Sequence, residues 1–262
     1  MIGSLAVLAA LVHGQIPPME PPAPIAGGEY SLVWHDEFEG EALNEQKWSI
    51  WTLGPRRDAI NTAESVSLDG EGHLAISVTV REGENGEPIY ETGGVWTRDT
   101  YVTRYGFFEA RMKLQDTIGF WSAFWMNSPR MGQDLGDPAK GGVEIDIMEA
   151  IAGGEYRDRV MNTIHWDGYG EAHKKDHSKT RIENLHTDWH TFAVEWTPDE
   201  LVFFTDGVET WRTDAAVPRL AEYLLLTCEV GDWGGEIEDA DLPAQILVDY
   251  VRVWQRADEA GD

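Results

Sequence analysis

The sequence lacks the features of a membrane protein, of a disulfide-stabilised scaffold and of a helical domain. Its single cysteine, Cys228, allows no intrachain disulfide, so the fold depends on its core. Cys228 lies in an apolar, strand-like run, and we interpret it as a small buried side chain. The apolar run at residues 5–12 is too short to span a bilayer. No segment shows a sustained 3.6-residue periodicity, which excludes a helical bundle.

Basic residues are also scarce. The chain has 20 Lys and Arg residues against 47 Asp and Glu residues, which gives a formal net charge of −27. Long-range repulsion of this kind disfavours nucleic acids, anionic membranes and other polyanions as partners. We therefore expect a neutral polymer as the partner of a monomeric protein, with no role for nucleic acid or membrane.

The two ends of the chain differ in composition from the middle. Residues 1–14 resemble a secretory signal peptide, with a short apolar run before small residues, although the basic segment that usually comes first is missing. Residues 15–28 contain five prolines and predict an extended linker that is neither helix nor central strand. We expect a secreted protein, extracellular or periplasmic, with one folded domain at residues 29–257 and an acidic tail at 258–262.

Short strand signals separated by turn residues dominate the rest of the chain. The 27 glycines and 12 tryptophans suit a β-rich protein with many tight turns. Turn signals at residues 69–72, 197–200 and 206–207 predict hairpins. Strand-like runs occupy residues 65–68, 73–78, 107–114, 192–196, 201–204 and 246–254. We expect an all-β sandwich of two antiparallel sheets, in which the one helical candidate is a short turn at residues 218–222.

Residues 144–149, EIDIME, combine three carboxylates with three apolar side chains. In a strand, Glu144 and Asp146 share the polar face, whereas Glu149 falls on the apolar face. Burying an unpaired carboxylate there would cost several kcal/mol. A β-bulge at Ile147 or Met148 would return Glu149 to the polar face. We therefore predict a row of three acids, and a pair of carboxylates is what cleavage of a glycosidic bond requires.

Acids that alternate with apolar residues also occur on solvated strand faces, but aromatic residues flank this motif. Residues 120–125, FWSAFW, contain four aromatic rings. Flat rings beside carboxylates suit a sugar-binding groove, because pyranose faces are apolar and their edges are polar. Trp121 and Trp125 share one face of a strand, and we predict them as stacking platforms, with core packing as the alternative.

These segments together resemble glycoside hydrolase family 16, the jelly-roll laminarinases, lichenases, agarases and carrageenases. The resemblance extends from residue 32 to residue 255. Residues 32–38 (LVWHDEF), 106–114, 121–125 and 248–253 (VDYVRV) are similar to the family's first strand, central cleft strands and last strand, and residues 144–149 to the bulged form of its catalytic motif. The resemblance implies a concanavalin-like jelly roll of two antiparallel sheets with a concave substrate cleft.

The resemblance also implies a retaining endo-hydrolase. Glu144 would be the nucleophile, and Glu149 the general acid and then the base that activates water. Asp146 would hydrogen-bond Glu144. Repulsion among the three acids would raise the pKa of Glu149, as a proton donor near neutrality requires. Retention is implied by the resemblance alone, since the spacing along a straight strand exceeds the separation that retention needs.

Further residues match positions that the family uses for binding. Trp96, His165 and Trp166 lie where the family places cleft residues, and Asn61 and Arg98 are candidates to hydrogen-bond sugar hydroxyls. Many members carry calcium, ligated in part by an aspartate of the last strand. Asp249 has that position here, so a structural calcium is expected there, whereas the chemistry requires no cofactor.

The resemblance leaves the polysaccharide open. The bulged motif, Trp121, Trp125 and the His165-Trp166 pair favour β-1,3-glucan or mixed-linkage β-1,3-1,4-glucan. The basic island at residues 173–181 is expected to be a solvated loop. If it borders the cleft, it would grip sulfate or carboxylate groups and favour an algal galactan such as agarose, porphyran or carrageenan. A transglycosylase and a non-catalytic sugar-binding jelly roll are further alternatives, although a lectin would not need all three acids.

Overall fold

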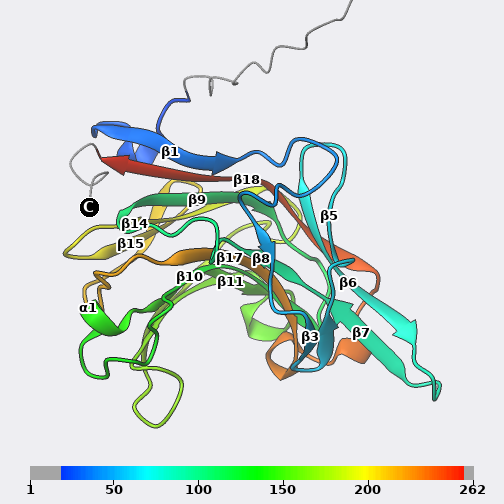
Figure 1. The fold of residues 1–262 in the computed structure, drawn as a ribbon. Helices are drawn as coiled ribbons and strands as arrows, with labels where there is room; N and C mark the ends of the chain where they lie inside the picture. The colour runs from blue at the N-terminus through cyan, green and yellow to red at the C-terminus, as the bar shows by residue number, and fades with distance from the viewer. Residues whose placement is uncertain (1–18, 257–262) are drawn as a thin grey trace, which may run out of the picture.

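The computed structural model describes residues 19–256 and consists of two stacked β-sheets (Figure 1). The larger sheet has the order β16 (Val208–Thr213), β15 (Leu201–Thr205), β14 (His190–Trp196), β9 (Gly106–Lys113), β18 (Ala244–Arg256), β6 (Leu74–Glu82), β7 (Pro88–Thr92), β4 (Ala59–Asn61) and β3 (Gly54–Arg56), with β1 (Tyr30–Asp36) paired to β18 and β5 (Val66–Leu68) to β6. Neighbouring strands are antiparallel except β4 and β7. The predicted all-β sandwich is confirmed.

The smaller sheet carries the acidic motif. Its order is β13 (Lys174–Arg181), β12 (Arg159–Trp166), β11 (Glu144–Ile151), β10 (Phe120–Asn127), β17 (Tyr223–Val230), β8 (Gly94–Trp96) and β2 (Ser49–Ile50). In Figure 1 the strands β10, β11 and β17 arch toward the larger sheet, so that the outer face of the smaller sheet is concave. We call this outer face the concave face.

The core lies between the two sheets and follows the two-residue alternation of the strands. Phe108, Ala110 and Met112 of β9 point inward from the larger sheet, and they belong to the same buried cluster as Phe124 of β10 and Cys228 of β17. Side chains between these positions point outward. The interpretation of Cys228 as a small buried side chain is confirmed.

The predicted hairpins are present. The segments at residues 69–72 and 197–200 connect antiparallel partners, β5 with β6 and β14 with β15. Asp206 and Gly207 connect β15 to β16 with φ angles of 51° and 74°. Two successive positive φ values fit the type I′ turn, whose twist matches that of the strands it joins.

The predicted helix at residues 218–222 is wrong. That segment is irregular, and Glu222 forms an isolated bridge with Thr103. The α-helix of the described residues is α1 (Pro138–Gly141), where Pro138 supplies a helical φ at the first position. The remaining helical turns are the 3-10 elements η1 (Ala23–Ile25), η2 (Gly154–Tyr156), η3 (Asp232–Gly234) and η4 (Ile237–Asp239). None of the described helices has the length and apolar character needed to cross a membrane.

The proline-rich stretch packs against the domain over its described part. Residues 19–28 include η1, and Ile25 is 3% exposed in a cluster with Phe107, Ala193 and Trp254. The expectation of an extended spacer therefore fails for this part, because apolar side chains between the prolines cover the outer face of the larger sheet. The predicted signal peptide at residues 1–14 and the acidic tail at 258–262 lie outside the described residues.

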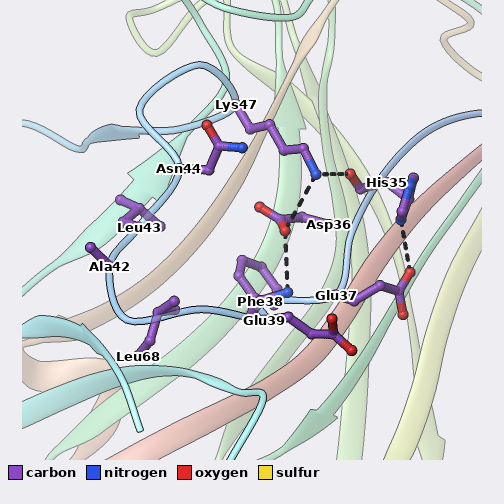
Figure 2. Close-up of a pocket in the computed structure, with 10 residues that line it drawn as sticks. All are labelled: His35, Asp36, Glu37, Phe38, Glu39, Ala42, Leu43, Asn44, Lys47 and Leu68. Atoms are coloured by element: carbon purple, nitrogen blue, oxygen red, sulfur yellow. Dashed lines mark hydrogen bonds and ion pairs between the residues drawn. The ribbon is translucent and has the colours of Figure 1, made fainter. Parts of the chain in front are cut away.

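The segment after β1 is held by polar contacts around a cavity of about 220 Å³ (Figure 2). Lys47 Nζ donates to the His35 carbonyl at 2.6 Å and lies 3.4 Å from Asp36 Oδ1. The other carboxylate oxygen of Asp36 accepts from Trp48 Nε1 at 2.9 Å. These groups satisfy one another and fix the N-terminal part of the domain to the core.

Candidate active site

A β-bulge in β11 places the three acids on one face, as predicted. On β12, Asp146 pairs with Thr163 and Glu149 with Met161, so that Ile147 and Met148 together oppose one residue. Both apolar side chains are fully buried in the core. Because two successive residues point inward, Glu149 returns to the concave face with Glu144 and Asp146.

The residue opposite the bulge, Asn162, satisfies the extra backbone group. Its Nδ2 donates to the Ile147 carbonyl at 2.7 Å, and its Oδ1 accepts from Thr210 Oγ1 at 3.2 Å. Asn162 is fully buried, so no water is available to replace this donor. The bulge is therefore supported from the adjacent strand and by β16 of the larger sheet.

Glu144 is held by two donors that sequence analysis missed. Its Oε2 accepts from Asn127 Nδ2 at 2.8 Å and from the hydroxyl of Tyr169, and Asn127 also donates to that hydroxyl at 2.8 Å. Burial raises the pKa of Glu144, and the hydrogen bond from Tyr169 opposes this rise without cancelling it. The two donors therefore stabilise the ionised form that a nucleophile needs.

His165 stands beside two of the acids. Its Nε2 is 3.3 Å from Asp146 Oδ2 and 4.0 Å from Glu144 Oε1. On its other side, Nδ1 is 2.8 Å from His173 Nε2, and the two rings stack. Burial lowers the pKa of His165. The imidazole is thus neutral near pH 7 and links the carboxylates to the segment after β12.

Asp146 and Glu149 are protonated over a wider pH range than free carboxylic acids. Burial raises the pKa of each well above its usual value, and repulsion from the neighbouring acids adds to it. Arg57 has the opposite, smaller effect on Glu149. The sequence analysis attributed the raised pKa of Glu149 to repulsion among the acids. This repulsion is present, but burial raises the pKa more. A carboxylic acid in this state can donate a proton near neutrality.

A fourth acid, Glu229 of β17, also faces this site and was missed by the sequence analysis. Its carboxylate accepts from Arg56 Nη2 at 2.9 Å and from Arg57 Nε. Glu229 is the cross-strand partner of Trp121 of β10, so it lies on the concave face. The guanidinium of Arg57 lies 5.0 Å from the ring centroid of Trp121, whose edge also meets Trp233. Trp121 is consequently only 6% exposed, which leaves it little area for stacking on a sugar.

Trp125 belongs to an aromatic cluster on the same face. It packs with Trp51 and Trp96 around Tyr223 and Leu225, and we call these five residues the aromatic wall. Trp125 Nε1 donates to Thr227 Oγ1 at 3.1 Å, which fixes the orientation of the indole.

Arg98 lies beside this wall as well. Its guanidinium is 5.3 Å from the ring of Trp96 and 5.9 Å from that of Tyr223. The structure thus brings Trp96, Arg98 and Trp125 together on one side of the acids.

Within residues 19–256, two of the predicted binding residues form no hydrogen bond or ion pair with the acids. Trp166 packs on the main core, because it follows His165 directly and adjacent strand residues point to opposite faces. Asn61 is buried in β4, where its Nδ2 has no hydrogen-bond partner among the described residues.

The surroundings of Asp249 do not fit the expected calcium site. Its Oδ2 accepts from Arg111 Nη1 at 2.6 Å, so a guanidinium already neutralises the carboxylate. Within residues 19–256, two groups could supply three acid or imidazole ligands, and neither includes Asp249. They are Asp69, Glu71 and His73 in one case and Glu144, Asp146 and His165 in the other.

Carboxylates beside aromatic rings on a concave sheet are the groups that the binding and cleavage of a polysaccharide require. The sequence profile described as "Beta-porphyranase A-D, GH16 domain" matches residues 33–256. The chain therefore belongs to glycoside hydrolase family 16, and it is a glycoside hydrolase.

Individual relatives agree with this assignment. The chain is 30% identical to a β-glucanase of Rhodothermus marinus, over 86% of this chain and 85% of the relative. It is also 30% identical to β-porphyranase B of Zobellia galactanivorans, over 88% and 86%. Among solved structures, SCLam, a non-specific endo-β-1,3(4)-glucanase from family GH16, aligns with a TM-score of 0.72 at 30% identity, covering 92% of this chain and 94% of that one.

Proposed function

We propose that the protein is a secreted, endo-acting, retaining glycoside hydrolase that cleaves β-1,3-glucan or mixed-linkage β-1,3-1,4-glucan. The observation that carries this proposal is the bulge, which places Glu144 and Glu149 on one face in different environments. Two donors favour the carboxylate form of Glu144 against the effect of burial, whereas Glu149 has no hydrogen-bond donor among the described residues and a strongly raised pKa. Such a division suits one nucleophile and one proton donor.

The proposed reaction is a double displacement. Glu144 attacks the anomeric carbon while Glu149 protonates the leaving oxygen, which gives a glycosyl ester on Glu144 and releases one half of the chain. Ester formation removes the negative charge of Glu144, and the repulsion that raises the pKa of Glu149 falls. Glu149 can then accept a proton from the water that hydrolyses the ester. Asp146 and His165 hold the charge and orientation of Glu144 through both steps.

The rest of the proposal concerns the substrate and the setting. The aromatic wall offers apolar surface for the faces of neutral sugar rings, and the charge of −27 favours an uncharged polymer. The chemistry uses side chains alone and requires no cofactor. The proposed enzyme acts as a monomer outside the cell, away from membranes.

A sulfated galactan is the second candidate substrate. Basic side chains of β13 face the same side of the sheet as the acids, and the matching family profile is that of β-porphyranases. If this candidate is correct, the enzyme cleaves porphyran or carrageenan and leaves laminarin intact.

Product analysis on laminarin, lichenan, agarose, porphyran and carrageenan tests the proposal. We expect internal cleavage of laminarin or lichenan, with the β-anomer released first in NMR spectra. Glu144→Gln should abolish turnover and preserve binding. Glu109→Gln is the matched control, because Glu109 is also a largely buried glutamate but lies on the outer face of the larger sheet, where it accepts from Tyr250. Near-normal rates in Glu144→Gln, or an initial α-anomer, would refute the mechanism.

A further inference from the structure

The basic island at residues 173–181 is an edge strand and not the predicted loop. Strand β13 (Lys174–Arg181) pairs with β12 along its whole length. Its side chains alternate between two environments: Lys175, His177, Lys179 and Arg181 are exposed, whereas Asp176, Ser178 and Thr180 are half-buried. These four exposed side chains are basic or imidazole groups on one face, and we call them the basic row. Lys174, at the start of the strand, is exposed as well, but it alternates to the opposite face and pairs with Asp167.

The basic row lies on the concave face, in register with the catalytic acids. Lys175 is the cross-strand partner of His165, which pairs in turn with Glu144. His177 is the partner of Thr163, which pairs with Asp146. Cross-strand partners point to the same face. Two strand spacings separate β13 from β11, so the basic row runs roughly 10 Å from the acids.

The opposite face of β13 is committed to the larger sheet. Thr213 Oγ1 of β16 donates to Asp176 Oδ2 at 3.2 Å, and Thr180 Oγ1 donates to the Thr210 carbonyl at 3.5 Å. These contacts fix which side of the strand is exposed. The basic row therefore cannot turn away from the concave face without breaking them.

Within the described part of the chain, two members of the row have a side-chain partner and two have neither an ion-pair nor a hydrogen-bond partner. Lys179 Nζ lies 4.3 Å from the ring centroid of Tyr156, and Arg181 pairs with Asp158 at 3.4 Å. Among the residues from 19 to 256, Lys175 and His177 form neither an ion pair nor a side-chain hydrogen bond. In a chain with 47 acids, unpaired basic groups side by side at the end nearest His165 are conspicuous.

An alternative explanation is that lysines on an edge strand have no role beyond preventing edge-to-edge association. That role places no demand on which face they occupy, and here four of the five exposed basic and imidazole side chains of β13 lie on the face with the acids. The acids therefore stand between two different surfaces. One is the aromatic wall, on β10, β17, β8 and the residue after β2, and the other is the basic row on β13.

We propose that Lys175 and His177 form an anion subsite for a sulfate ester or carboxylate on a sugar bound at the β13 side of the acids. The aromatic wall would take an uncharged sugar face at the other side. A local pair of basic groups acts within about 10 Å, so it can hold one anionic group although the whole molecule repels polyanions. The inference rests on the proposed endo-glycosidase activity and decides between its two substrates, since an unsubstituted glucan leaves this subsite unused.

Binding of matched oligosaccharide pairs tests the subsite in the full chain carrying Glu144→Gln, which prevents turnover. One pair consists of sulfated porphyran oligosaccharides and their desulfated forms. The other consists of β-1,3-gluco-oligosaccharides oxidised at C6 to carboxylates and their unmodified forms. Calorimetry should show tighter binding of the anionic member in one pair, and that pair identifies sulfate or carboxylate as the ligand group.

Adding Lys175→Ala and His177→Ala should reduce this preference about tenfold, the sum of two exposed charge contacts. The matched control is Lys113→Ala, which removes an exposed lysine from the outer end of β9 in the larger sheet and should leave the preference as it was. Absence of any preference, or an equal preference in both variants, overturns the subsite. Anion preference without hydrolysis of any polymer would instead defeat the proposed function and leave the subsite standing.

Discussion

Tyr169→Phe tests whether the segment after β12 sets the environment of Glu144, the proposed nucleophile. The substitution removes one hydroxyl, which donates to Glu144 Oε2, and retains the ring. Asn127 remains as the second donor at 2.8 Å. Because the lost hydrogen bond favours the carboxylate, the pKa of Glu144 should rise further above its usual value.

The size of the effect follows from the strength of such a bond. A hydrogen bond to a charged group contributes roughly 1.5–3 kcal/mol, and one pKa unit corresponds to about 1.4 kcal/mol. Tyr169 is 62% exposed, so solvent screening places the effect at the lower end of this range. We expect a rise of about one pKa unit, which moves the acid limb of kcat/KM to higher pH by the same amount.

The assay is the pH profile of kcat/KM on a soluble oligosaccharide. Tyr250→Phe is the matched control, because Tyr250 donates to Glu109 at 2.9 Å on the opposite sheet and touches none of the acids of the site. Its profile should coincide with that of the unmodified enzyme. An acid limb that stays in place in Tyr169→Phe, or moves to lower pH, would refute the assignment of Tyr169 as a positioning residue.

Two further predictions concern buried polar groups. Asn162→Ala leaves the Ile147 carbonyl without its donor. The free energy of unfolding, measured with denaturant, should fall by about 1–3 kcal/mol. The value of kcat should also fall, because the bulge that directs Glu149 loosens. Glu222→Gln should raise the melting temperature at pH 7 and not at pH 4. Burial raises the pKa of Glu222, so the unmodified protein is destabilised as pH rises above the ordinary value of 4.5, whereas glutamine stays neutral and its Oε1 still accepts from the Val143 amide. Equal shifts at both pH values would contradict the second prediction.

The bulged main chain of β11 could be predicted from the six residues 144–149. A regular strand would bury Glu149, and the cost of an unpaired buried carboxylate makes a bulge the cheaper arrangement. The structure has the bulge at Ile147 and Met148. The same two-residue alternation excludes Trp166 from the face of His165, although the pair was predicted as neighbours in the cleft. That error came from the family resemblance, which named positions without testing their faces.

The surroundings of the acids could not be predicted in the same way. Arg56 and Arg57 are more than 170 positions away from Glu229 along the chain, and no local pattern announces their contact. Tyr169 is closer, 25 residues after Glu144, but it reaches that side chain from a loop. Contacts of this kind depend on how the strands are ordered in the sheet, and the order β12, β11, β10, β17 is a property of the whole fold.

Strand β13 shows why side chains can alternate between two faces of a strand without a strand being predicted. Strand prediction looks for alternation of apolar and polar residues, and every residue from Lys174 to Arg181 is polar. In β13, basic or imidazole side chains alternate instead with Asp176, Ser178 and Thr180. The face that carries Asp176 and Thr180 packs on β16 through hydrogen bonds of these two residues. Since pairing with a neighbouring strand and side-chain hydrogen bonds can position a strand that has no apolar face, a run of basic residues beside small polar ones should be tested for a strand before it is assigned to a solvated loop. Here that test would have placed Lys175 and His177 on one face from the sequence alone, and the pairing with β12 shows that the face is the one that carries the acids.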